Sequence, residues 1–375
     1  MRYGSVCSGI EAATVAWHSL GWKPVWFAEI EKFPSHVLAH HYPEISNLGD
    51  MTTIAGKIKN NEVEAPDILV GGTPCQAFSV AGLRNSLDDD RGQLSLEFVR
   101  LANEIDSARS IRGFEPAIIV WENVPGVLNT KDNAFGCFLG ALSGEECELQ
   151  PTGKKWPNAG CVFGPSRQVA WRILDAQYFG VAQRRKRVFV IASARTECIA
   201  EVLFEQASMF GNSSEIRKTE KVNPLDIAKC LTRRGAGGQN LDAETATFVV
   251  HGTQDPLLSE ETAHCLGRNN GQENAIFTIN KTAATLTRGL GDRGGDADQI
   301  IGGNCAIQSS GVRRLTPTEC ERLQGFPDHY TNILGAKDTP RYAALGNSMA
   351  VPVMQWIGKR INEYFADVES VGGGV

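Results

Sequence analysis

Residues 67–79 read Asp-Ile-Leu-Val-Gly-Gly-Thr-Pro-Cys-Gln-Ala-Phe-Ser, and this stretch decides the fold. Its start, residues 67–70, is a short apolar run that predicts a buried strand. Two glycines then allow close backbone approach to a ligand, and Pro74 stiffens the loop directly before the sulfur of Cys75. Open α/β sheets bind their ligands at the carboxyl ends of strands. The stretch therefore predicts an α/β protein with Cys75 as a candidate nucleophile, against the alternative of a structural cysteine in a turn.

Strand-like and helical patterns alternate on both sides of this stretch. Strands are expected at residues 3–7, 25–28, 117–121 and 187–192, and helices at residues 11–20, 33–40 and 94–105. Such alternation predicts a doubly wound, mostly parallel sheet that is covered by helices on both faces.

The sequence changes character after about residue 205. Residues 212–311 are rich in Gly, Asn, Thr, Arg and Asp and contain a weak repeat at residues 228–233, 263–268 and 283–288, with strand-like runs at residues 247–250 and 275–279. We predict a large domain made of residues 1–204 plus 326–375, and a smaller β-rich domain of residues 205–325. The repeat loops either present Arg and Asn to a nucleic acid or are solvated turns.

The C-terminal part becomes regular again. Thr316, Pro317 and Glu319 have the spacing of a helix start with a capping box. Residues 351–365 have a helical apolar pattern, and we expect the last ten residues, which end in Gly-Gly-Gly-Val, to be disordered.

Composition and charge bound the class of protein. The chain has 375 residues, of which 42% are hydrophobic and 21% charged, which is typical of a globular protein with a large core. It shows neither a run of about 18 apolar residues nor the pattern of a signal peptide, so we expect a cytoplasmic, monomeric protein with no membrane partner.

The ten cysteines are irregularly spaced, without a Cys-x-x-Cys pair, and are expected to be free thiols, with no metal site. The net charge of −6 argues against a protein that coats nucleic acid, but basic clusters at residues 184–187 and 233–234 leave a DNA enzyme open.

Two further groups are candidates for chemistry. Glu122 directly follows the predicted strand at residues 117–121, so it lies beside the Cys75 loop if the two strands are neighbours. Alternation places Arg185 and Arg187 on one face at the start of another strand. The plainer interpretations are a helix cap or salt bridge for Glu122 and a solvated basic edge for the arginines.

Five motifs, in this order, resemble the DNA (cytosine-5)-methyltransferases. They are Pro74-Cys75-Gln76, Glu122-Asn123-Val124, Gln183-x-Arg185-x-Arg187, residues 313–327 (Arg-x-Leu-Thr-Pro-x-Glu-x-x-Arg-Leu-Gln-Gly-Phe-Pro) and residues 346–352 (Gly-Asn-Ser-Met-Ala-Val-Pro). The resemblance covers nearly the whole chain except residues 130–165 and 205–310. It implies a Rossmann-like fold that binds S-adenosylmethionine, and transfer of a methyl group to carbon 5 of a flipped-out cytosine in double-stranded DNA.

The resemblance also implies roles for individual residues. Cys75 adds to carbon 6 of cytosine, Glu122 acts at ring nitrogen 3, and Arg187 with Arg185 holds the exocyclic oxygen and the ring. The cofactor is expected to contact Cys7, Ser8, Gly9, Ile10, Glu29, Ile30, Asp50, Met51, Pro74, Asn347 and Met349. Glu29 ends the second strand and is expected to bind the ribose hydroxyls, while Ile30 lies against the adenine and Asp50 bonds its amino group.

One motif departs from the family. Its cofactor loop usually reads Phe-x-Gly-x-Gly, whereas residues 7–11 read Cys-Ser-Gly-Ile-Glu and keep only Gly9. This leaves the details of the cofactor contacts open.

Three other functions remain as alternatives. A tRNA cytosine-5 methyltransferase would use the same motifs, although a long variable segment favours sequence readout on DNA. A cysteine hydrolase would need a histidine near Cys75, and none lies in the five motifs. An inactive DNA-binding protein would not need the Cys75, Glu122 and arginine set. The target DNA sequence, and pairing with a restriction enzyme, do not follow from the sequence.

Overall fold

The structure is a computed structural model, and it describes residues 1–73, 93–204, 247–251, 258–259, 274–278 and 311–371. Pro74, Cys75 and the three repeat copies therefore lie outside the described residues.

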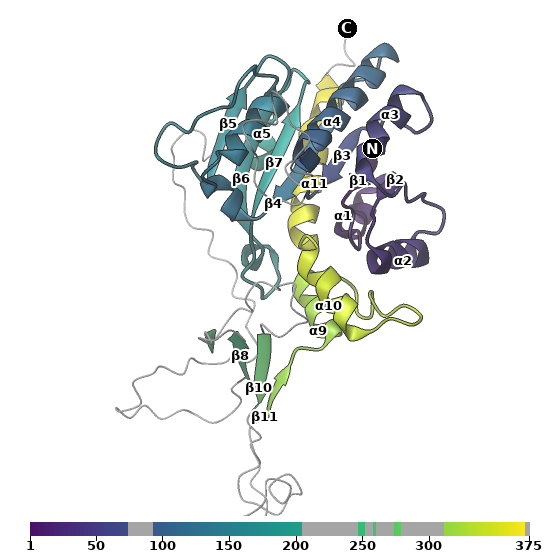
Figure 1. Cartoon of the computed structure of the whole chain (residues 1–375), viewed down its shortest axis with the longest axis vertical. Helices are drawn as coiled ribbons and strands as arrows, with labels where there is room; N and C mark the ends of the chain where they lie inside the picture. Colours follow the sequence, from purple (N-terminus) through teal and green to yellow (C-terminus); the bar gives the residue numbers. More distant parts are fainter. Residues whose placement is uncertain (74–92, 205–246, 252–257, 260–273, 279–310, 372–375) are drawn as a thin grey trace, which may run out of the picture.

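A seven-stranded sheet forms the centre of the large domain (Figure 1). Its strand order is β2 (Lys23–Ala28), β1 (Arg2–Val6), β3 (Ile68–Gly71), β4 (Ile118–Asn123), β7 (Lys186–Ser193), β6 (Gln168–Asp175) and β5 (Ala159–Phe163). The pairs among β2, β1, β3 and β4 are parallel, and the pairs β4–β7, β7–β6 and β6–β5 are antiparallel. Five strands thus run in one direction while β7 and β5 run in the other, which confirms the predicted α/β fold with a mostly parallel sheet.

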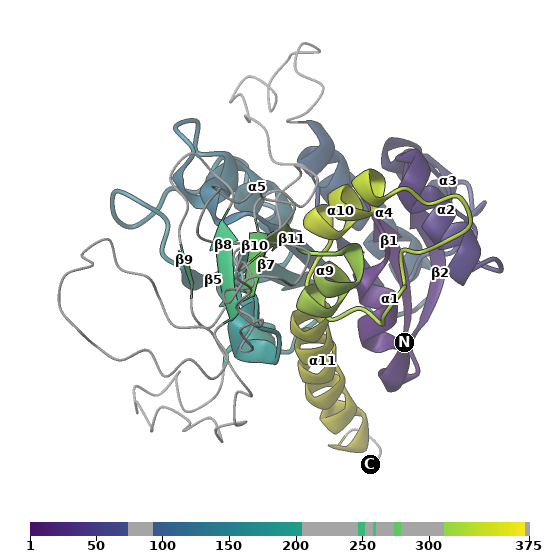
Figure 2. The ribbon, with the colours of Figure 1, turned by 90° about the horizontal axis from the view of Figure 1, so that it is seen from below.

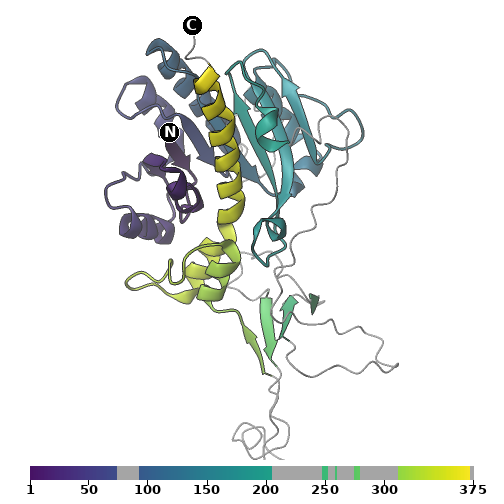
Figure 3. The same ribbon diagram turned by 180° about the vertical axis from the view of Figure 1, so that it is seen from behind.

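Both faces of the sheet are buried, which explains the continuous apolar runs of its central strands. Ile118 and Val120 belong to one core, whereas Ile119 and Trp121 belong to the other. The first core is completed by α1 (Ala12–Trp17), α2 (Lys32–His41), α6 (Ala200–Leu203) and α11 (Val351–Val371), and the second by α3 (Ile54–Lys59), α4 (Gln93–Ile111) and α5 (Ala134–Ser143). The sheet therefore has the two covered faces that the sequence predicts (Figure 3).

The C-terminal helix returns to the sheet as expected. The indole nitrogen of Trp17 donates a hydrogen bond of 2.8 Å to the main-chain oxygen of Met354, joining α1 to α11. α11 extends to Val371, so residues 366–371 are helical, and the expectation that the last ten residues are disordered is wrong for them.

Three elements between residues 130 and 175 were not predicted from the sequence. α5 is buried on almost every side, so it has no polar face and shows no helical period. β5 and β6 pair as an antiparallel hairpin that extends the sheet beyond β7. The chain also forms short 3₁₀ turns at η1 (His18–Leu20), η2 (Met51–Thr53), η4 (Pro125–Asn129) and η5 (Ala176–Phe179).

Two further helices, α9 (Pro317–Gln324) and α10 (Asp338–Asn347), lie at the start of α11 (Figure 2). The predicted capping box is confirmed, because Thr316 and Glu319 bond each other's backbone nitrogens. Leu315 and Cys320 belong to the first core, so α9 is joined to the large domain.

A second, antiparallel sheet lies beyond α9 and α10 from the main sheet (Figures 1 and 3). Its order is β11 (Gly311–Arg314), β10 (Asn274–Thr278), β8 (Thr247–His251) and β9 (Leu258–Ser259). β8 and β10 confirm the two predicted strands, whereas the boundaries of a separate small domain remain a prediction. Within the described ranges, no helix has the length and apolar character needed to cross a membrane.

Candidate functional site

The carboxyl ends of three neighbouring strands bring the predicted residues to one level. In the sheet register, Val6 of β1 is paired with Gly71 of β3, and Gly71 is paired with Trp121 of β4. The next residues along the three strands are Cys7, Gly72 and Glu122. The expected neighbourhood of Glu122 and the loop that leads to Cys75 is therefore confirmed at the level of the strands.

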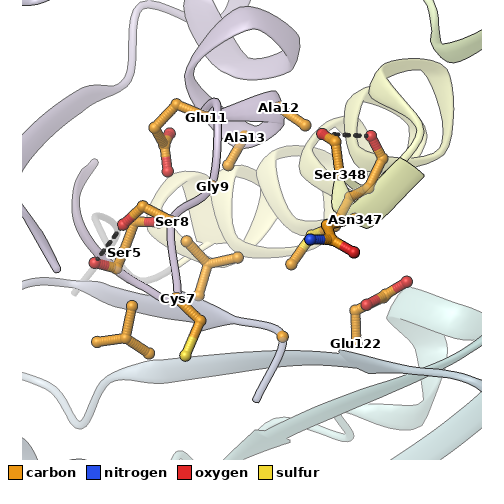
Figure 4. A pocket seen from close by; sticks show the side chains of 14 residues that line it. Ser5, Cys7, Ser8, Gly9, Glu11, Ala12, Ala13, Glu122, Asn347 and Ser348 are labelled. Atoms are coloured by element: carbon orange, nitrogen blue, oxygen red, sulfur yellow. Dashed lines mark hydrogen bonds between the residues drawn. The ribbon is translucent and has the colours of Figure 1, made fainter. Parts of the chain in front are cut away.

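A cavity opens at this level (Figure 4). It encloses about 400 Å³ of empty space, part of which is open to solvent. Its lining comes from β1 and the loop after it, from β3, from β4 and from the turn between α10 and α11. The lining residues are Ser5, Val6, Cys7, Ser8, Gly9, Glu11, Ala12, Ala13, Val70, Gly72, Glu122, Asn347, Ser348 and Met349.

The loop after β1 has an unusual backbone. Its residues Cys7, Gly9 and Glu11 have φ angles of +48°, +57° and +63°. A positive φ is ordinary for glycine and uncommon for other residues. The loop therefore curls tightly around the cavity although only one of these three residues is glycine.

Glu29, at the end of β2, holds this loop. Its two carboxylate oxygens accept hydrogen bonds of 2.7 Å from the Gly9 nitrogen and 2.6 Å from the Glu31 nitrogen. Burial raises the pKa of this carboxyl. Glu29 is not among the cavity-lining residues, so the described contacts place it directly behind the loop, and its expected bond to a ribose stays a prediction.

Glu122 faces the cavity from β4 and is paired with one of the predicted arginines. The Arg187 Nε lies 3.0 Å from the Glu122 Oε1, and their side chains are only 14% and 11% exposed. Burial raises the pKa of Glu122, and the charges of Arg187 and Arg185 oppose that rise. A methyl group on Gly72 would lie 3.0 Å from the Glu122 Oε2, so the backbone of the neighbouring strand end packs closely against this carboxyl.

The first residue of the cysteine loop, Thr73, is held by two residues of β4. The Asn123 side chain donates a hydrogen bond of 2.9 Å to the Thr73 main-chain oxygen, and the Trp121 indole donates one of 2.9 Å to the Thr73 hydroxyl. The point at which the chain enters the loop toward Cys75 is thereby fixed against β4. The sequence motif gave no separate signal for this anchoring by Trp121.

Arg185 is buried behind the cavity and bonds a distant loop. Its guanidinium donates hydrogen bonds of 3.0 Å and 2.6 Å to the main-chain oxygens of Gly346 and Ser348. Asn347 lies between these two residues and lines the cavity together with Met349, as the resemblance implies. The described contacts therefore make Arg185 a support of the α10–α11 turn.

Four other predicted cofactor contacts are described by the structure and are not among the lining residues. Ile10 is fully buried in the core, and Met51 is buried against Cys7, with 3.7 Å between the two sulfur atoms. Ile30 is 77% exposed, and Asp50 is also exposed and caps η2 through the Thr52 nitrogen. An exposed Ile30 is compatible with a ligand that covers it, and the roles of these residues stay predictions.

Several lining residues were not predicted from the sequence, among them Ser5, Glu11, Gly72 and Ser348. Glu11 had a signal, because it stands where the resembling family has a glycine. The lining contains two carboxylates, those of Glu11 and Glu122, and the described residues contribute no Lys or Arg side chain to it. Such a cavity suits a ligand that carries positive charge.

Comparison with protein families gives a match over nearly the whole chain. The model of the family described as C-5 cytosine-specific DNA methylase matches residues 1–363.

Two phage proteins are similar over almost all of this chain. One is described as a DNA N-6-adenine-methyltransferase of Escherichia phage P1, is 42% identical over 468 residues, and is matched over 96% of this chain and 61% of its own length. The chain therefore spans less than two thirds of that relative. The other is described as an orphan methyltransferase of Bacillus phage SPR, is 31% identical over 452 residues, and is matched over 99% of both chains.

Among solved structures, the S. pombe Dnmt2 methyltransferase has a similar fold. The match has a TM-score of 0.57 and 15% sequence identity, and it covers 98% of this chain and 99% of that one. At this identity the likeness supports the fold alone.

Proposed function

Because the chain belongs to the C-5 cytosine-specific DNA methylase family, we propose that it methylates carbon 5 of cytosine in double-stranded DNA. The observation that carries the proposal is the placement of Glu122. This buried carboxyl is paired with Arg187, and it faces the cavity one strand away from the anchored start of the Cys75 loop. The proposal further places the protein in the cytoplasm, where it acts as a monomer.

S-adenosylmethionine is the cofactor, and the cavity fits it. The molecule has a net positive charge, because its sulfonium and α-ammonium groups outweigh its α-carboxylate, and the described cavity lining is acidic and free of basic side chains. Gly72 lines the cavity with its backbone alone. A Cβ atom added to it would lie 3.0 Å from Glu122 and 3.4 Å from Met349, and would therefore take up space beside these two lining residues. Cys7, Ser8 and Gly9 on one side, and Asn347 and Met349 on the other, would hold the cofactor, which supplies an activated methyl group.

The proposed chemistry follows from the weak nucleophilicity of cytosine carbon 5. The Cys75 thiolate adds to carbon 6, the electron pair moves toward ring nitrogen 3, and carbon 5 becomes nucleophilic. Glu122 supplies a proton at nitrogen 3, for which a carboxyl with a raised pKa is suited. After carbon 5 is methylated, its proton leaves to a base, the thiolate departs from carbon 6, and the proton on nitrogen 3 returns to Glu122, which restores the aromatic ring and the free enzyme.

Arg187 has two tasks in this scheme. It keeps Glu122 in place through their ion pair and presents positive charge to the exocyclic oxygen of the ring. A stacked base cannot reach a buried carboxyl at the end of a strand, so the target cytosine has to leave the duplex.

Methylation of adenine N6 is a second candidate, because the phage P1 relative is described with that activity. Adenine N6 is an exocyclic amine that can be methylated directly, so a thiolate that adds to the ring has no task in that reaction. More than a third of the P1 relative lies outside the match. We therefore favour cytosine, and analysis of the methylated nucleosides separates the two products.

The test uses duplex DNA, tRNA and two forms of the protein. The wild type should produce 5-methylcytosine in duplex DNA, detected by mass spectrometry of the digested nucleosides. Cys75→Ser should abolish the product while leaving cofactor affinity unchanged by calorimetry. DNA with 5-fluorocytosine at the methylated position should trap the wild type covalently, because fluorine replaces the proton that has to leave. N6-methyladenine as the product, methylation of tRNA alone, or near-normal turnover by Cys75→Ser would contradict the proposal.

A further inference from the structure

Glu11 is a buried carboxylate with no task in the proposed chemistry. Its side chain lines the cavity, and the residue is only 1% exposed. Its backbone is left-handed, with φ 63° and ψ 62°, at the position where the family motif has glycine. Residues held in such conformations are found preferentially at functional sites.

All described hydrogen-bond partners of the Glu11 side chain donate to it. The Thr14 nitrogen donates at 3.0 Å, and the Thr14 hydroxyl also donates to the same carboxylate oxygen. Tyr3 donates its own hydroxyl proton to Thr14 at 2.8 Å, which directs the Thr14 proton toward Glu11. Ser5 forms a further side-chain hydrogen bond that favours the charged form. A carboxylate surrounded by donors is prepared to carry a negative charge.

That charge lacks a positive partner in the described part of the chain. None of the ion pairs among the described residues includes Glu11, and burial raises the pKa of its carboxyl. An ionised carboxylate buried without a cation is costly. Glu11 lines the cavity, so a cation that enters the cavity can supply the partner.

We propose that Glu11 binds the α-ammonium group of the methionine part of S-adenosylmethionine, an inference that rests on the proposed function. The cofactor has two cationic groups, and of the two carboxylates in the described lining, Glu122 is already paired with Arg187. Glu122 and Glu11 lie on different sides of the cavity (Figure 4). Because the sulfonium has to be close to the reacting base near Glu122, the ammonium group is the cation left for Glu11.

The experiment compares two ligands that differ only in this ammonium group. They are S-adenosylhomocysteine and its deamino analogue, in which hydrogen replaces the α-ammonium, and calorimetry measures their affinities for the full-length protein. The wild type should bind S-adenosylhomocysteine about tenfold or more tightly than the analogue. Glu11→Gln keeps an acceptor for Thr14 but removes the charge, so it should lose most of this preference while binding the analogue at least as well.

Two further variants make the result unambiguous. Glu11→Gly suits the left-handed backbone and should behave like Glu11→Gln, which covers a failure of the glutamine variant to fold. Glu29→Gln should weaken both ligands by the same factor, because the ribose is common to both. Equal weakening of both ligands in the Glu11 variants would show a structural cap and overturn the inference, as would an unchanged preference. Failure of the wild type to bind either ligand would instead overturn the proposed function.

Discussion

At the residue scale, burial sets the properties of the acidic side chains around the cavity. Glu11, Glu29 and Glu122 are all buried, and burial raises the pKa of each carboxyl. They differ in their partners. Glu122 is paired with Arg187, Glu29 accepts two backbone N–H groups, and Glu11 accepts hydrogen bonds from Thr14. One residue type thus serves three tasks, which are set by the groups that face it.

The pair of Glu122 and Arg187 can be tested by stability. Arg187→Met should destabilise the protein by about 3 kcal/mol in urea denaturation, because it leaves a buried carboxylate without its cation. In the variant the pKa of Glu122 in the folded state rises further above its value in the unfolded state. The folded state then holds a proton that the unfolded state has already released. The loss of unfolding free energy is therefore small at low pH and grows as the pH rises through the folded pKa.

A double variant supplies the control for this prediction. Glu122→Gln combined with Arg187→Met removes both charges and should be more stable than Arg187→Met alone. Equal stability of these two proteins at every pH would show that the ion pair is too solvated to matter.

Glu29 can be tested through the cofactor. Glu29→Ala should weaken S-adenosylmethionine binding by about 1.5–3 kcal/mol, the cost of losing hydrogen bonds to a charged group. It removes the acceptor of Gly9 as well as the expected ribose contact, so the loop after β1 loosens. Calorimetry measures the affinity, and DNA binding should change less. An unchanged cofactor affinity would place the ribose elsewhere.

At the element scale, the cavity depends on a turn between two helices. The turn from α10 to α11 contributes Asn347, Ser348 and Met349 to the lining, and Arg185 from the start of β7 holds it through two main-chain oxygens. One terminal nitrogen of the guanidinium donates both hydrogen bonds, and the planar group holds that nitrogen in a fixed direction. The motif arginine thereby connects the sheet with the C-terminal helices.

Arg185→Lys tests this connection. The lysine retains the charge but has a shorter side chain without the rigid planar end group, so the turn should shift and the cofactor should bind about tenfold more weakly by calorimetry. Arg360→Lys is the matched control. Arg360 also donates to main-chain oxygens, those of Glu201 and Val202 on α6 and of Phe204 directly after it, and none of these residues lines the cavity. Equal losses of cofactor affinity in both variants would indicate a general loss of stability.

At the scale of the whole molecule, the catalytic candidates and the repeat segment lie in different parts of the chain. Every motif of the resembling family lies outside residues 212–311, and the described strands of that range join β11 in a separate antiparallel sheet. A protein that reads DNA sequence needs contacts to base edges besides its contacts to phosphate. We expect residues 212–311 to supply those contacts.

Arg233, Arg268 and Arg288 occupy equivalent positions in the three repeat copies and are the residues to replace. If an arginine reads guanine, its alanine variant should relax specificity at one base pair by about 1–3 kcal/mol. If it contacts only phosphate, the variant should weaken all sites alike and reduce the salt dependence. Sequencing of the methylated sites measures both effects. If all three variants methylate the same DNA sequence as the parent, with the same salt dependence, the repeats have a structural role only.

The amino-acid sequence by itself determined the elements with a strong local period and the residues within short motifs. Strands such as residues 67–70 and 117–121, and the capping box at Thr316, follow from interactions within a few residues and were found where expected. The placement of Glu122 at the end of the strand next to β3, which leads toward Cys75, also followed, because the ends of neighbouring parallel strands meet at one edge of a sheet. Local patterns failed for α5, which is buried all around and so shows no periodic face.

Only the tertiary structure decided how distant segments meet. Arg185 and the turn at Gly346 and Ser348 are 161 and 163 residues apart along the chain, and no local pattern encodes their contact. The same holds for the order β4–β7–β6–β5, in which β7 is inserted between β4 and β6 and runs against both. In the sequence, Glu11 is only a departure from the glycine of the family motif. In the structure, it is a carboxylate residue that lines the cavity. The reason is that burial and nearby hydrogen-bond donors set the pKa of a carboxyl group. For Glu11, the burial and the donors come from residues that the fold brings around it.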